Sequence, residues 1–249
     1  MASTAETAKR QQQYREKGWI SKALSVPFSI LGILLVSLFF SIVTEWIGLY
    51  FFWSEEGWHH SRDMLNNELD WLSTSFTQSL LIQNPDHFVR NTIGLAYEWG
   101  FEKTGIVDWI RLASEQARQN SANGTDLQRY ISLAYVQIEN FGLAAVYAAL
   151  TFLTRLLILT LSLPLFLMTA LTGLVDGLVR RDLRRFGAGR ESGFIYHRAK
   201  MLIVPLLILP WVIYPAFPIS ISPLLILLPI TVAFGITVSI SAGSFKKYL

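Results

Sequence analysis

Polar side chains that could carry out chemistry are densest just after residue 53, where acidic residues surround two histidines and a serine: Glu55, Glu56, His59, His60, Ser61 and Asp63. At helical spacing the acids and histidines would share a face, and zinc accepts such ligands. A hydrolase would use the same residue types as base and nucleophile, here His59, His60 and Ser61. The sequence has no HExxH zinc motif. We therefore expect a solvated helix start here, with no metal, no cofactor and no catalytic residue.

Two charged residues, Glu45 and Arg155, interrupt long apolar runs. An ionisable group in a membrane span is costly and usually faces protein, water or a partner charge. If both lie near the same membrane boundary, they are expected to form an intramembrane pair. Separate snorkelling of each side chain to the interface is the alternative. One acid and one base do not make a proton pathway.

A basic segment, residues 176–200, separates two further apolar runs. It carries three acidic residues and seven basic ones, namely Arg180, Arg181, Arg184, Arg185, Arg190, Arg198 and Lys200. Lys and Arg beside a membrane span resist translocation, which predicts that this segment is cytoplasmic. The first four arginines occupy helical positions i, i+1, i+4 and i+5, and therefore lie on one broad face.

The composition of the basic segment suggests a partner-binding site beyond its topogenic role. Arg forms planar, bidentate contacts with carboxylates and phosphates that Lys does not. The predicted contact residues are Arg180, Arg181, Arg184, Arg185, Arg190, Phe194, Tyr196 and His197. Contact with lipid headgroups alone is the simpler alternative. Direct nucleic-acid binding is not expected, because no groove-reading element accompanies the charge.

The composition identifies the class of protein. Apolar residues make up 52% of the chain and charged residues 16%, against roughly 25% charged in an ordinary soluble domain. The chain has no cysteine, which excludes disulfides and thiolate metal sites. An all-α integral membrane protein with four transmembrane helices is predicted.

The predicted order of segments follows from the apolar runs and from breakers such as Pro, Gly and Asn. It is a cytoplasmic tail 1–23, span 24–53, an acidic helical periplasmic domain 54–140, a long kinked span 141–175, the basic loop 176–200, spans 201–218 and 223–242, and a cytoplasmic tail 243–249.

Residues 54–140 carry twelve acidic and six basic side chains, which agrees with a translocated domain. Four helices are expected there, near 56–82, 86–101, 104–119 and 126–140. Both chain termini are then cytoplasmic, and a bacterial inner membrane is the expected location.

Three stretches carry a family resemblance: GLVDGLVRRDLRRFGAGRESGFIYHRAK (173–200), EWIGLYFFW (45–53) and the C-terminal FKKYL (245–249). They resemble the integrating-conjugative-element membrane protein family, which is encoded beside type IV secretion genes and a coupling ATPase. The resemblance implies a role in conjugative DNA transfer and carries over no catalytic motif.

The resulting expectation is a non-enzymatic inner-membrane scaffold of a conjugative type IV secretion apparatus. Its partners would be membrane lipid, the type IV coupling ATPase or other conjugation-machinery subunits, and, in a homo-oligomer, further copies of itself. A small oligomeric transporter or channel is the alternative function.

Overall fold

The computed structural model describes residues 19–75, 82–121, 126–186 and 193–245, and these parts are helical with short turns. Four helices are long and apolar enough to cross a membrane: α2 (Trp19–Phe51), α6 continued by α7 (Asp126–Leu161 and Leu163–Phe186), α8 (Gly193–Ala216) and α9 (Pro223–Gly243). The prediction of an all-α, four-span membrane protein is confirmed.

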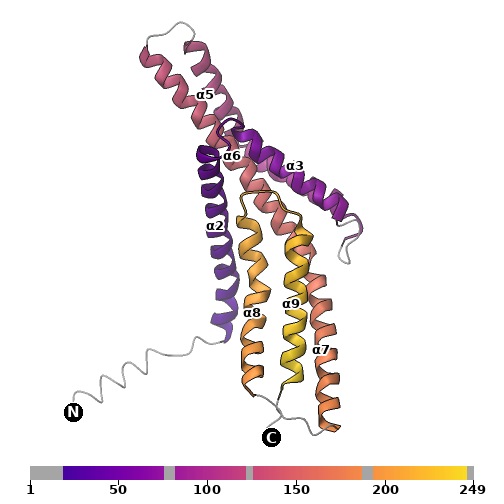
Figure 1. Ribbon diagram of the computed structural model, residues 1–249. Helices are drawn as coiled ribbons and strands as arrows, with labels where there is room; N and C mark the ends of the chain where they lie inside the picture. The colour runs from indigo at the N-terminus through magenta and orange to yellow at the C-terminus, as the bar shows by residue number, and fades with distance from the viewer. Residues whose placement is uncertain (1–18, 76–81, 122–125, 187–192, 246–249) are drawn as a thin grey trace, which may run out of the picture.

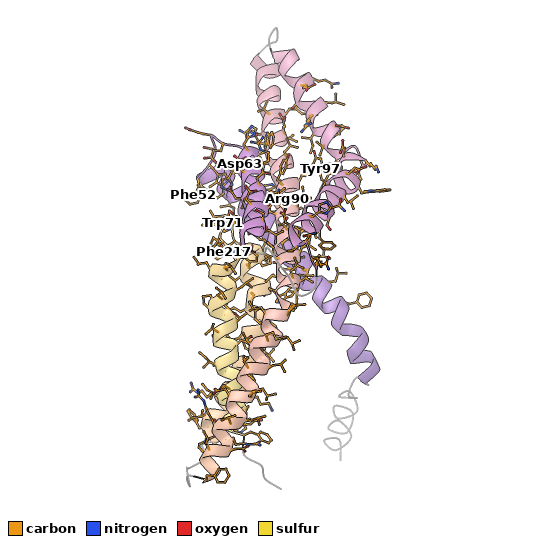
Figure 2. All side chains as sticks on the ribbon, turned by 90° about the vertical axis from the view of Figure 1, so that its right-hand side faces the viewer. Phe52, Asp63, Trp71, Arg90, Tyr97 and Phe217 are labelled. Atoms are coloured by element: carbon orange, nitrogen blue, oxygen red, sulfur yellow. The ribbon has the colours of Figure 1, made fainter. Side chains whose placement is uncertain are left out.

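The membrane helices form an uneven bundle. Helices α7, α8 and α9 run side by side, with α9 packed against both of the others (Figure 1). Helix α2 packs on α6 and α8. Its lower half stands apart from α7 and α9 in Figure 2. The large side chains of Phe28, Phe39 and Phe40 are more than half exposed there, as expected for residues that face lipid.

The acidic unit, residues 54–140, contains α3 (Trp58–Ser75), α4 (Pro85–Tyr97), a π-helical turn η1 (Glu98–Glu102), α5 (Ile106–Ser121) and the first part of α6. Pro85 begins α4 at a first-turn position, where its missing N–H costs no hydrogen bond. Helices α3 and α5 each pack along α6. Helix α6 therefore belongs to both the acidic unit and the membrane bundle (Figure 1).

A tight turn joins the first span to the acidic unit. Gly57 has φ 58°, a left-handed conformation that favours glycine. A side chain at Gly57 would also meet the Asn140 side chain at 2.9 Å. The turn therefore folds α3 back against α6 directly after α2 ends.

The structure adds detail to two predicted segments. The long second span is a single membrane-crossing stretch with a break beside Pro164, where α6 ends at Leu161 and α7 begins at Leu163. Pro164 has no N–H to continue the α6 ladder, so the chain restarts there. Within residues 176–200, α7 continues to Phe186, in agreement with the helical spacing of the arginines, and α8 begins at Gly193.

Candidate functional site

A buried polar cluster joins the acidic unit to the membrane bundle. Arg155 of α6 and Glu68 of α3 are 1% and 0% exposed, and their Nη2 and Oε1 atoms are 2.7 Å apart. The Arg155 Nε also donates to Glu68 Oε1 at 3.0 Å. The Tyr214 hydroxyl of α8 donates to the other oxygen, Glu68 Oε2, at 2.6 Å. Three helices are therefore tied together through one carboxylate.

The same guanidinium caps the end of α8. Arg155 Nη1 donates to the Tyr214 carbonyl at 3.3 Å and to the Phe217 carbonyl at 2.5 Å, and Nη2 donates to the Ile219 carbonyl at 2.9 Å. The last carbonyls of a helix lack intrahelical donors, so a cation is favourable there. Phe217 lies at the waist of the molecule, where the acidic unit meets the bundle (Figure 2).

The expected Glu45–Arg155 pair is wrong, since each residue has other partners. Glu45 is 1% exposed and its Oε1 accepts from Ser61 at 2.6 Å and lies 3.0 Å from Nδ1 of His60. The His60 ring stacks on Trp53 at 4.0 Å. The turn after α2 places the start of α3 against Glu45. Arg155 instead lies beside the end of α8. Both charges are buried in polar contacts rather than snorkelling.

The Glu45 cluster has the geometry of a structural contact. The Ser61 hydroxyl is fully buried and bonds to a carboxylate, whereas an activated serine bonds to an imidazole base. Among the residues that the structure describes, no group of three or more histidine or acidic side chains could hold a metal ion. The cluster anchors the end of α2 to α3.

The predicted partner-binding residues gather at one end of the bundle, which we call the basic end: residues 176–186 of α7 and 193–200 of α8. Arg180 pairs with Asp176 at 3.0 Å and is 66% exposed. Arg184 is half-buried, and one of its guanidinium nitrogens lies 3.7 Å from where a side chain at Gly243 would be. Arg181 lines a pocket together with Tyr196 and Ile203 of α8. The face that the spacing predicted as a single docking surface is therefore divided between α9 and α8.

Aromatic side chains flank this end. Phe186 is 91% exposed and Phe194 is 69% exposed, and His197 is exposed as well. Tyr196 is half-buried against Phe245, with ring centroids 5.6 Å apart. Arg190 and the side chain of Arg185 lie outside the described residues.

With this geometry in place, the comparison with known proteins decides the family. Residues 52–246 match the family model described as DtrJ-like, IncC plasmid conjugative DNA transfer protein. The chain belongs to the DtrJ-like family. No curated protein and no solved structure matches it. The resemblance to a conjugative membrane protein family is confirmed, and the chain is a multi-pass conjugative DNA transfer protein.

The matched residues of this DtrJ-like chain include the basic end and the buried cluster of Glu68, Arg155 and Tyr214. The sequence reasoning missed Glu68 and Tyr214, although Glu68 carried a readable signal. It lies between Leu65 and Leu72 on the apolar face of α3. An acidic residue on the apolar face of a helix is expected to be buried with a partner. Tyr214 had no such signal, because tyrosine is common near a membrane boundary.

A third polar contact holds α3 to α4 at the surface of the acidic unit. Arg90 bonds to Asp86 at 2.7 Å and to the Leu69 carbonyl and Asp70 at 3.2 Å. Partial burial alone would lower the pKa of the Arg90 guanidinium, but the hydrogen bonds and charges of the two aspartates outweigh burial and raise it. The two aspartates therefore favour the charged form of Arg90.

Proposed function

We propose that this DtrJ-like protein is a non-enzymatic scaffold in the inner membrane of a conjugative type IV secretion apparatus. Family membership supports the conjugative role. The burial of Glu68, Arg155, Glu45 and Ser61 in mutual contacts supports a structural rather than a catalytic use of these side chains. In this proposal the basic end faces the cytoplasm and the acidic unit faces the periplasm.

The basic end docks a cytoplasmic subunit, for which the coupling ATPase is the natural choice. The observation that supports docking is the exposure of Phe186 and Phe194, together with the Arg198 guanidinium 5.0 Å from the Phe194 ring centroid. Aromatic and arginine side chains are the usual anchors of protein interfaces. A segment that serves only as a topology signal needs positive charge. Exposed phenylalanine side chains at the end of the bundle have no role in such a signal.

Replacing arginine by lysine separates docking from topology. A variant with Arg180, Arg181, Arg184 and Arg185 all changed to Lys keeps the charge, so insertion and orientation should be unchanged. Bidentate contacts are lost, and conjugative transfer from donor cells should fall by about tenfold or more. Recovery of the coupling ATPase with the purified protein should fall in parallel.

The matched control changes Arg62 and Arg111 of the acidic unit to Lys, and transfer should then stay at the wild-type frequency. If the four-lysine variant also transfers at the wild-type frequency, the arginines serve topology and lipid contact only.

A further inference from the structure

A trough runs along the basic end between α7 and α8, with α9 as its floor. Its volume is about 340 Å³, and its apolar lining includes Leu174, Leu178, Ile203 and Val238. Helices α7 and α8 each pack on α9, which leaves this space between them. A volume of this size lies at the lower end of the range for small-molecule sites, roughly 300–1,000 Å³.

Among the described residues that line the trough, Arg181 is the charged one. Its side chain is 29% exposed, and its nearest ion-pair oxygen, on Asp182, is 3.8 Å away. The Arg181 Nε is buried and has no hydrogen-bond partner among the described residues. A buried guanidinium N–H without an acceptor is costly, and a phosphate oxygen is a suitable acceptor for it.

A second cation lies near one of the residues that line the trough. Tyr196 also lines the trough, and the Lys200 ammonium lies 5.9 Å from its ring centroid. The other face of α7 is different, because there Arg180 already pairs with Asp176, whose carboxylate also accepts from Ser239 of α9. Among the described arginines of α7, Arg181 is the one with a buried guanidinium N–H that lacks an acceptor.

We propose that this trough binds one anionic phospholipid, with its phosphate on Arg181 and an acyl chain between α7 and α8. Helices α8 and α9 are long and apolar enough to cross a membrane, and α7 ends a third such stretch, so the trough lies among membrane-crossing helices. Its apolar walls fit a hydrocarbon chain. Its charge fits an anionic headgroup, in the manner of basic pockets between membrane helices.

The test uses the purified full-length protein, stripped of lipid in detergent and then mixed with phosphatidylglycerol or with phosphatidylcholine of the same acyl chains. Native mass spectrometry counts the lipids retained. The wild-type protein should retain one phosphatidylglycerol in preference to phosphatidylcholine. Arg181→Gln should weaken phosphatidylglycerol binding by about tenfold.

Arg180→Gln is the matched control, since it removes the same charge one residue away and outside the trough. It should change lipid binding by less than about twofold. Leu178→Trp fills the trough and should weaken the binding of both lipids. The melting temperature shows whether the bundle of this variant stays folded. Equal losses for Arg181→Gln and Arg180→Gln, or no preference for the anionic lipid in the wild type, would overturn the site. These outcomes do not depend on the coupling ATPase, which is absent from the mixture.

Discussion

Arg155→Gln is expected to destabilise the protein by about 3–5 kcal/mol, because it leaves the Glu68 carboxylate buried without its counter-charge. The carbonyls of Phe217 and Ile219 would lose their donor as well. Glu68→Gln should destabilise the protein by a similar amount, because it leaves the Arg155 guanidinium buried without its counter-charge. Thermal melting in detergent measures both losses.

The double variant decides whether the two residues act as a pair. Glu68→Gln combined with Arg155→Gln should lose less than the sum of the single changes. Glu45→Gln combined with Arg155→Gln should instead be additive, because Glu45 bonds to His60 and Ser61. Coupling of Arg155 to Glu45 rather than to Glu68 would contradict the structure.

Arg90→Gln provides the surface comparison for these variants. Arg90 is 42% exposed and its ion pairs lie at the edge of the acidic unit. Exposed pairs contribute roughly 0.2–1 kcal/mol. A loss as large as that of Arg155→Gln would mean that burial of the Glu68–Arg155 pair is not what makes it important.

Gly173→Ala is expected to separate α7 from α9. A Cβ atom at Gly173 would lie 2.3 Å from the Gly235 carbonyl oxygen, and one at Gly177 would lie 2.4 Å from the Ser239 carbonyl oxygen. These neighbours are backbone atoms, which cannot rotate away. Overpacking typically costs about 1–3 kcal/mol and sometimes more. The detergent melting temperature should drop, and protease cleavage near the basic end should increase.

Gly32→Ala is the control for this prediction. Gly32 is also in a membrane helix, but a Cβ atom there would meet nothing within 4 Å. Alanine is the better helix former by about 1 kcal/mol, so this variant should be neutral or slightly more stable. If Gly173→Ala melts at the wild-type temperature, the close contact of α7 with α9 is not needed.

The elements of the fold follow from the sequence because each depends on local pattern. Long apolar runs predict the spans, and Asn84 before Pro85 marks the start of α4. The arginines after Val179 are on a helix, as their spacing predicted. These features need no knowledge of which helix lies next to which.

The pairings could not be predicted, because they depend on how helices are placed around each other. Gly173 and Gly177 are four residues apart, as are Gly235 and Ser239, and this spacing is typical of close helix contacts in membranes. Nothing in the sequence says that these two stripes meet. Similarly, the partner of Arg155 comes from α3, 87 residues away, because α3 folds back along α6.

The basic end is expected to face the cytoplasm and the acidic unit the periplasm, and single cysteines test this orientation most directly. The chain has no cysteine of its own, so Gln116→Cys on α5 and Gly193→Cys at the start of α8 give one thiol each. Both positions are exposed, and a side chain at Gly193 meets no neighbour. In intact cells, a membrane-impermeant thiol reagent should label Gln116→Cys at once and Gly193→Cys only after the membrane is opened. Labelling of Gly193→Cys in intact cells would contradict the orientation and, with it, the docking of a cytoplasmic partner at the basic end.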